Sequence, residues 1–228
     1  MSKIVITIDG PGGSGKSTVA RKLAIKLGFI HLNSGALYRV VGIEAWKRGK
    51  SLDDDQAISA LTAETSFEFS LTADQSTRLS VDGRDISNEI SSAEAGKLAS
   101  QIGVLPGVRA ILSEVQRKVA QHNSVVVEGR DAGTVVFPYA MLKICLDADL
   151  DIRAERRLRE ELSRQEQSAS KEAFEQVKAE LDTRDMRDSS RAVAPHRRAE
   201  DSILIDTSRM SVDEVVAKIA ELFRVRCH

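Results

Sequence analysis

A stretch of eight residues near the N-terminus has the composition and spacing of a loop that binds phosphate groups. It reads Gly10, Pro11, Gly12, Gly13, Ser14, Gly15, Lys16 and Ser17. Glycines permit positive φ angles, so successive backbone N–H groups can turn inward around an anion. Lys16 would bring a positive charge to the outer phosphates of a nucleotide, and the Ser17 hydroxyl could bind Mg²⁺. The stretch therefore predicts a site for a nucleoside phosphate and its metal ion.

Two further polar turns follow predicted buried strands. Residues 33–35 (Asn-Ser-Gly) come after the apolar run 29–32, and residues 128–131 (Glu-Gly-Arg-Asp) come after the valine-rich run 124–127. In a parallel sheet the carboxyl ends of the strands meet at one edge, where ligands bind. Arg39 lies one turn into the helix that we expect next, so it could reach an anion there. We therefore expect the phosphate loop and both turns to line one site.

Short apolar runs that alternate with helical segments predict the fold. Five of them, at residues 4–8, 29–32, 124–127, 141–146 and 203–205, have the length and β-branched content of buried strands. Strands connected in this way give an α/β fold, with a five-stranded parallel sheet covered by helices on both faces. Residues 64–92 instead alternate polar and apolar positions, which predicts antiparallel strands forming a small inserted lobe.

Arginines are concentrated between the last two predicted strands. The members that we expect at the ligand are Arg153, Arg156, Arg157, Arg184 and Arg191, with Asp188 between the last two. The spacings of four and three residues within 184–191 place these charges on one helical face. Repulsion among them is tolerable if phosphate groups lie between them. We assign Arg159 and Arg164 to solvent.

These features divide the chain into three parts. We expect a core formed by residues 1–37, 101–152 and 190–228, a lobe at residues 38–100 that includes the insertion 64–92, and an arginine-rich lid at residues 153–189. The polar stretch 162–170 predicts mobility within that lid. A lid that closes over a phosphoryl donor excludes water, which would otherwise compete with the acceptor.

The composition is that of a soluble globular protein, with 42% hydrophobic and 29% charged residues among 228. A net charge of −1 gives no overall attraction to nucleic acid, and no apolar run approaches the roughly 20 residues that span a membrane. Two distant cysteines and the lack of a signal peptide predict a cytoplasmic protein. We expect ordinary surface or structural roles for the four histidines, and packing for Trp46.

No residue pair in the sequence suggests a covalent nucleophile with its base. A phosphate loop together with many arginines indicates phosphoryl transfer by positioning and charge neutralisation. An acceptor that is itself a phosphate is already nucleophilic, so transfer to it requires no general base. The guanine-reading Asn-Lys-x-Asp motif of GTPase switches is absent. Loop, lobe and lid together therefore predict a nucleotide kinase.

Four motifs make the chain resemble the bacterial cytidylate (CMP/dCMP) kinases over nearly its whole length. They are residues 8–11 (Ile-Asp-Gly-Pro), 34–39 (Ser-Gly-Ala-Leu-Tyr-Arg), 129–138 (Gly-Arg-Asp-Ala-Gly-Thr-Val-Val-Phe-Pro) and 184–195 (Arg-Asp through Ala-Pro). The resemblance implies a P-loop NTPase fold, in which residues 64–92 set the monophosphate-binding lobe of this family apart. It also implies a monomer that transfers the γ-phosphoryl group of Mg-ATP to CMP or dCMP.

The resemblance further implies roles for individual residues. ATP would be bound by the eight loop residues, Thr18, Arg153, Arg156 and Arg157, with Mg²⁺ on Ser17. The acceptor phosphate would be held by Ser34, Arg39, Arg130 and Arg191, the cytosine by Ser100, Arg109 and Asp131, and the sugar by Arg184 and Asp188. Lys16, Arg130, Arg157 and Arg191 would act on the transferred group. A carboxylate that accepts from the amino group of cytosine would repel the oxygen of uracil.

Three positions depart from the pattern of that family. Asn33 stands where an acid is expected, Glu128 stands where aspartate is familiar, and the loop ends in Lys16-Ser17 rather than Lys-Gly-Thr. The resemblance therefore does not assign the residues that surround the metal ligand. Two alternatives also stay open. One is a kinase of another small acceptor, such as a different nucleoside monophosphate, and the other is a regulatory nucleotide-binding module that hydrolyses slowly and signals through a partner.

Overall fold

The computed structural model describes residues 3–86, 89–165 and 170–227. The main elements in chain order are β1 (Val5–Asp9), α1 (Lys16–Leu27), β2 (Ile30–Asn33), α2 (Ser34–Lys47), α3 (Asp55–Glu64), β3 (Phe67–Leu71), β4 (Thr77–Val81), β5 (Arg84–Asp85), α4 (Ala93–Ile102), α5 (Pro106–His122), β6 (Val125–Gly129), β7 (Leu142–Asp147), α6 (Leu150–Gln165), α7 (Lys171–Ser190), β8 (Ile203–Asp206) and α8 (Val212–Cys227). A short 3₁₀ helix (Glu89–Ser91) and a π-helical turn (Ala132–Val136) complete them.

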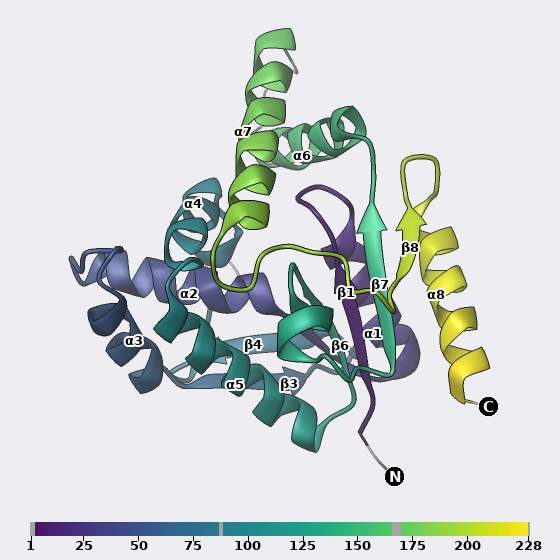
Figure 1. The fold of residues 1–228 in the computed structure, drawn as a ribbon, viewed down its shortest axis with the longest axis horizontal. Helices are drawn as coiled ribbons and strands as arrows, with labels where there is room; N and C mark the ends of the chain where they lie inside the picture. Colours follow the sequence, from purple (N-terminus) through teal and green to yellow (C-terminus); the bar gives the residue numbers. More distant parts are fainter. Residues whose placement is uncertain (1–2, 87–88, 166–169, 228) are drawn as a thin grey trace.

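The central sheet has the strand order β2-β6-β1-β7-β8, and all of its pairs are parallel (Figure 1). The predicted five-stranded parallel sheet is therefore confirmed. The register places Gly129 beside Asp9, and Asn33 beside Glu128. The phosphate loop and both polar turns consequently leave the sheet at the same edge, as the sequence predicted.

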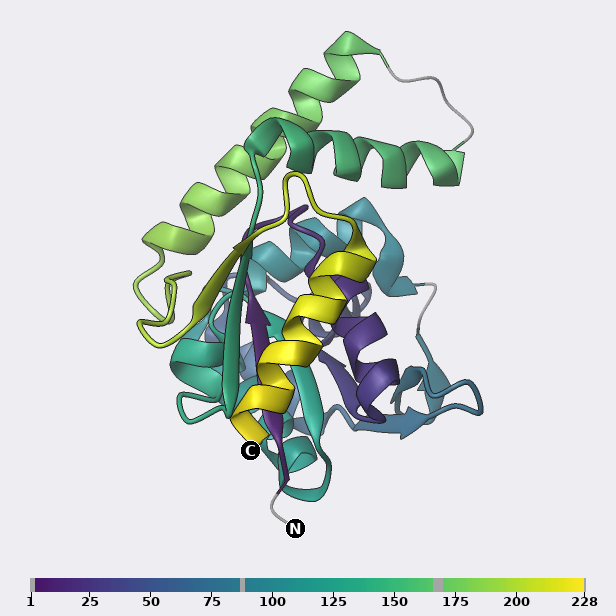
Figure 2. The ribbon, with the colours of Figure 1, turned by 90° about the vertical axis from the view of Figure 1, so that its right-hand side faces the viewer.

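Helices cover both faces of this sheet. On one face, α1 and α8 bury Ile8 and Leu146 in a cluster that continues to Phe223 (Figure 2). On the other face, α2, α5 and the π-helical turn form a second cluster around Leu32 and Val127. The sheet is thus shielded on both sides, which explains why its strands are nearly continuous apolar runs.

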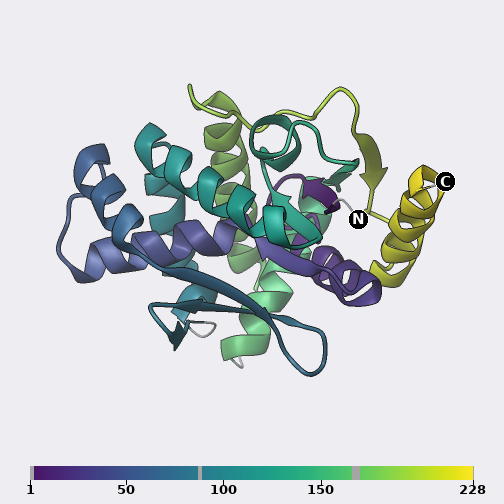
Figure 3. The same ribbon diagram turned by 90° about the horizontal axis from the view of Figure 1, so that it is seen from below.

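The insertion forms a three-stranded antiparallel sheet in the order β3-β4-β5, with Phe67 opposite Val81. The predicted antiparallel strands are confirmed, and they extend below α2 in the view of Figure 3. Leu79 and Val81 are buried in the same cluster as Ile30 and Val125 of the central sheet. The small sheet is therefore anchored on the main core.

Helices α6 and α7 pair above the carboxyl edge of the central sheet and share a cluster of Ala154, Leu158, Val177 and Leu181 (Figures 1 and 2). Residues 166–169 of the stretch predicted to be mobile lie outside the described residues. The prediction that the charges at 184, 188 and 191 share one face of a helix is wrong for the last of them. Arg191 is the first residue beyond α7, with extended backbone angles (φ −61°, ψ 141°), because the chain turns there toward β8.

The expectation that Trp46 packs in the interior is wrong, since 63% of this residue is exposed. Helix α2 buries its other face through Leu37, Val40 and Val41. Trp46 lies near the end of that helix, on the side away from the core. In the described ranges, no helix is both long and apolar enough to cross a membrane.

Candidate active site

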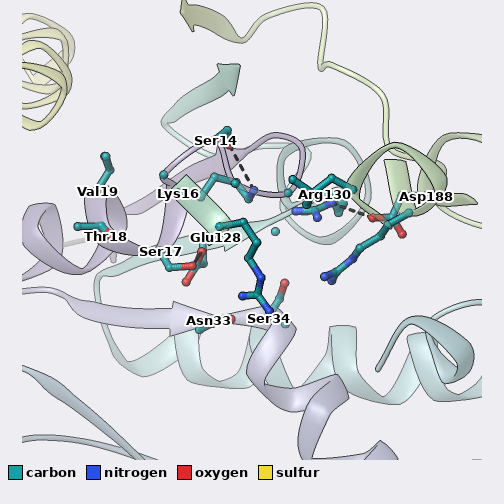
Figure 4. A pocket seen from close by; sticks show the side chains of 18 of the residues that line it. Ser14, Lys16, Ser17, Thr18, Val19, Asn33, Ser34, Glu128, Arg130 and Asp188 are labelled. Carbon is teal, nitrogen blue, oxygen red and sulfur yellow. Dashed lines mark hydrogen bonds and ion pairs between the residues drawn. The ribbon is translucent and has the colours of Figure 1, made fainter. Parts of the chain in front are cut away.

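A cavity of about 710 Å³ opens at the carboxyl edge of the central sheet, between the phosphate loop, α2, α4 and the α6–α7 pair (Figure 4). It brings together residues that are far apart in the sequence. The predicted site residues that line it are Gly12, Gly13, Ser14, Gly15, Lys16, Ser17, Thr18, Ser34, Arg39, Ser100, Arg109, Arg130, Asp131, Arg156, Arg157, Arg184, Asp188 and Arg191. Gly10, Pro11 and Arg153 do not line it.

The phosphate loop has the backbone conformation that its glycines predict. Gly10, Gly13 and Gly15 have φ angles of 149°, 74° and 88°. A side chain at Gly10 would also collide with the carbonyl oxygen of Leu146, 2.0 Å from an ideal Cβ position. Only glycine fits these conditions. The loop can therefore direct its N–H groups into the cavity at the start of α1.

Lys16 is buried, and its ammonium donates to the carbonyl oxygen of Pro11 at 2.5 Å. Burial lowers the pKa of this lysine well below its usual value, and the neighbouring charge of Arg130 lowers it further. Both causes disfavour the charged form. A phosphate in the cavity would favour it again, so Lys16 is suited to an anionic ligand.

Three arginines, Arg130, Arg184 and Arg191, form a guanidinium cluster beside the loop. Arg130 donates to the carboxylate of Asp188 at 2.9 Å and to the carbonyl oxygen of Gly10 at 2.8 Å. The buried Nε of Arg184 has no hydrogen-bond partner among the described residues. Burial, followed by the charge of Arg130, lowers the pKa of Arg184 to about 10. The cluster thus has more positive charge than its carboxylates neutralise, which is the condition for holding phosphate groups.

A buried ion pair lies next to the guanidinium cluster. The guanidinium of Arg109 donates to the carboxylate of Asp131, and Arg109 also lies 5.6 Å from the ring centre of Tyr38. Arg191 approaches the other oxygen of Asp131 at 3.4 Å. Ser100 lines the same region and accepts a hydrogen bond from Arg187 at 3.2 Å. A donor and an acceptor side by side, beside a cation cluster, can read the polar edge of a base that carries a phosphate.

Asp9 is a residue whose role the sequence did not indicate, although it belongs to the motif at residues 8–11. Its two carboxylate oxygens accept the N–H groups of Ala132 at 2.9 Å and Gly133 at 2.7 Å. Burial raises the pKa of Asp9 to about 6, although these two hydrogen bonds act to lower it. Asp9 therefore fixes the turn that carries Arg130 and Asp131. An acid at the end of a buried strand was the only available signal.

Ser17 and Glu128 lie together at the floor of the cavity (Figure 4). The Ser17 hydroxyl donates to a carboxylate oxygen of Glu128 at 2.6 Å. Within the described residues, no cluster of three or more histidine, cysteine, aspartate or glutamate side chains could hold a metal ion. Mg²⁺ prefers oxygen ligands and is commonly bound by one or two protein groups together with the phosphates of a nucleotide. This donor set fits Mg²⁺ that arrives with a nucleotide.

The arginines of α6 divide between the cavity and the loop. Arg156 donates to the hydroxyl of Thr207 at 2.9 Å, and Arg157 pairs with Glu161 at 2.8 Å; both line the cavity. Arg159 also borders the cavity but is exposed, as expected from its assignment to solvent. Residues three apart on α6, such as Arg156 and Arg159, lie on the same side of the helix, so both can border the cavity.

Arg153 has a different position from the one expected of an ATP ligand. Its guanidinium donates to the carbonyl oxygen of Gly12 at 3.1 Å and pairs with Asp185 of α7. Asp185 in turn accepts the N–H of Gly12 at 3.3 Å. This ion pair holds the phosphate loop from behind.

The family model for cytidylate kinase matches residues 6–225 of the chain. The chain belongs to the cytidylate kinase family. It is 42% identical over 217 residues to a cytidylate kinase of Pasteurella multocida, covering 95% of this chain and 93% of that protein. It is 45% identical over 225 residues to a cytidylate kinase of Thermotoga sp. (strain RQ2), with 97% of each chain covered. An uncharacterized protein from Eubacterium ventriosum has a similar fold, with a TM-score of 0.53, 16% identity and coverage of 96% of this chain and 98% of that one.

The chain also contains a histidine close to the guanidinium cluster. Burial, together with the charges of Arg130 and Lys16, lowers the pKa of His196 to about 4 from an ordinary value of 6.5. In the unfolded chain His196 therefore becomes protonated near pH 6.5, whereas in the folded chain it stays neutral down to about pH 4. The contribution of His196 to the free energy of unfolding is fully present above pH 6.5. It decreases as the pH falls toward 4, by up to about 3 kcal/mol.

We expect the substitution His196→Gln to remove this pH-dependent loss. Urea unfolding at pH 7.0, 6.0, 5.0 and 4.5 measures the free energy of unfolding of both proteins. As the pH falls, the free energy of unfolding should decrease more for the wild type than for the variant. An unchanged difference across this range would show that His196 titrates normally in the folded state.

Proposed function

We propose that the chain is an ATP-dependent kinase that converts CMP and dCMP into CDP and dCDP. The observation that carries this proposal is the buried Arg109–Asp131 pair, located in the same cavity as the phosphate loop and the guanidinium cluster. Cytosine offers an amino donor next to ring acceptors, which this pair would match. Membership of the cytidylate kinase family supports the same substrate.

The two nucleotides would bind end to end. The phosphate loop and Lys16 would hold the outer phosphates of ATP, and Ser17 would bind the accompanying Mg²⁺. When bound, Mg²⁺ would neutralise phosphate charge and orient the donor. Ser34, Arg39, Arg130 and Arg191 would hold the acceptor phosphate, while Arg184 and Asp188 would contact the sugar.

Catalysis in this arrangement requires no general base, because the phosphate of the acceptor is itself the nucleophile. Lys16, Arg130, Arg157 and Arg191 would stabilise the charge on the transferred group. In this mechanism residues 38–100 would bind the monophosphate, residues 153–189 would close over it, and the remaining core would bind ATP. The enzyme would act as a monomer. Closure would exclude water and so favour transfer over hydrolysis.

Production of ADP from Mg-ATP tests the proposal when CMP, dCMP, UMP, AMP and no acceptor are compared in parallel. We expect fast turnover with CMP and dCMP, and slower turnover with UMP, because Asp131 would face the oxygen of uracil. Faster turnover with AMP than with CMP would contradict the reading of cytosine. Slow ADP release that is independent of any acceptor would instead identify a nucleotide-hydrolysing regulatory module.

A further inference from the structure

A chain of hydrogen bonds connects strand β2 to the phosphate loop. The Nε2 atom of His31 lies 3.0 Å from one carboxylate oxygen of Glu128, and the other oxygen accepts from the Ser17 hydroxyl at 2.6 Å. The side chains of His31 and Glu128 are 13% and 4% exposed. The mechanism described above uses Ser17 but gives no role to His31.

The chemistry of these groups fixes the direction of each hydrogen bond. An ionised carboxylate only accepts, so Nε2 of His31 must carry a proton and the Ser17 hydroxyl must direct its single proton toward Glu128. The lone pairs of the Ser17 oxygen are then left to face the cavity. A serine hydroxyl that binds a metal ion must present its lone pairs in this way.

Glu128 can keep this orientation only if both of its oxygens are engaged. A buried carboxylate requires hydrogen-bond donors, and it turns toward whichever donors remain. The backbone N–H of His31 donates to the hydroxyl of Thr77 on β4 at 2.8 Å. His31 is therefore held at its backbone by the small sheet while its ring holds Glu128.

We propose that His31 is a positioning residue for the magnesium–nucleotide site, which acts through Glu128 to orient the Ser17 hydroxyl. It strengthens the binding of nucleotide that arrives with Mg²⁺, and it contributes little to the binding of nucleotide alone. The inference rests on the proposed function, because it assigns the metal-bound donor to the phosphate loop. It also gives Glu128 a defined part at a position where the family resemblance left the metal surroundings unassigned.

Calorimetric titration with ADP tests this role in the presence of excess Mg²⁺ and, separately, in EDTA. We expect His31→Leu to weaken the binding of Mg-ADP about tenfold, in line with the effect of removing groups that orient a metal ligand. Binding of ADP in EDTA should change less than about twofold. His31→Gln should recover most of the loss, because its amide can donate to Glu128. His122→Leu, at an exposed position at the end of α5, is the matched control and should change neither value.

Equal weakening with and without Mg²⁺, or failure of His31→Gln to recover binding, would overturn the proposal. The ¹⁵N spectrum of the wild-type imidazole provides a second measurement that requires no variant. The proton of His31 should reside on Nε2, and finding it on Nδ1 alone would also overturn the proposal. ADP binding involves no acceptor, so these results stay interpretable even if CMP is not the substrate.

Discussion

Replacing Lys16 with methionine is expected to lower kcat for transfer to CMP by about a thousandfold, the typical effect of removing a preorganised group that stabilises transferred charge. The buried ammonium donates to the carbonyl oxygen of Pro11 within the loop, and methionine keeps the length of its apolar stem. The fold should be as stable as wild type at pH 7 or more stable. The reason is that burial lowers the pKa of Lys16, so keeping the charged form in the folded state has a cost that methionine removes.

Steady-state kinetics and urea unfolding of Lys16→Met test both halves of this prediction. Lys22→Met is the matched control, because Lys22 lies on the same helix, is largely exposed and pairs with Asp213 at 2.7 Å. The control should retain wild-type kcat. A Lys16→Met protein with kcat near that of wild type would refute the role of the loop lysine. Lost activity with lost stability would indicate that Lys16 is structural.

Replacing Asp131 with asparagine is expected to lower kcat/KM for CMP roughly a hundredfold, because a charged hydrogen bond to the base is lost. The KM for ATP should stay nearly unchanged, since Asp131 makes its contacts with Arg109 and Arg191 rather than with the phosphate loop. The preference for CMP over UMP should also narrow, because the amide can donate to the oxygen of uracil.

Asparagine is the informative substitution because of the contacts that Asp131 makes. The carboxylate pairs with Arg109 and lies 3.4 Å from Arg191, so alanine would remove the carboxylate partner of the buried Arg109 and leave Arg191 with Asp188 at 3.8 Å. Removing one partner of a buried ion pair destabilises a protein by about 3–5 kcal/mol. Asp201→Asn, at an exposed carboxylate that pairs with the buried Lys143 outside the cavity, is the control. Equal increases of KM for ATP and CMP in Asp131→Asn would show that Asp131 only maintains the structure.

The parts of the molecule that depend on local chemistry follow from the sequence. The spacing of Gly10, Gly13 and Gly15 determines a loop with positive φ angles, because other residues cannot adopt them without strain. The five apolar runs determine the parallel sheet, and the polar residues that follow them must then meet at one edge. The phosphate loop, Arg130 and Asp131 were thus predictable at one site.

Only the tertiary structure decided which helical faces meet the cavity. Helical spacing shows that Arg153, Arg156 and Arg157 are neighbours, but it does not show which of them points inward. The fold places Arg153 against the phosphate loop, where it donates to the carbonyl oxygen of Gly12, and leaves Arg156 and Arg157 to line the cavity.

Contacts between residues far apart in the chain were equally hidden in the sequence. Asp9 holds a turn that begins 123 residues later, and Ser17 meets Glu128 across 111 residues. No local pattern marks such partners, because the register of β2 and β1 against β6 alone brings them within hydrogen-bond distance. The sequence by itself therefore determined which residues can bind phosphate. The register of the sheet decided which other side chains, such as Asp9 and Glu128, position them.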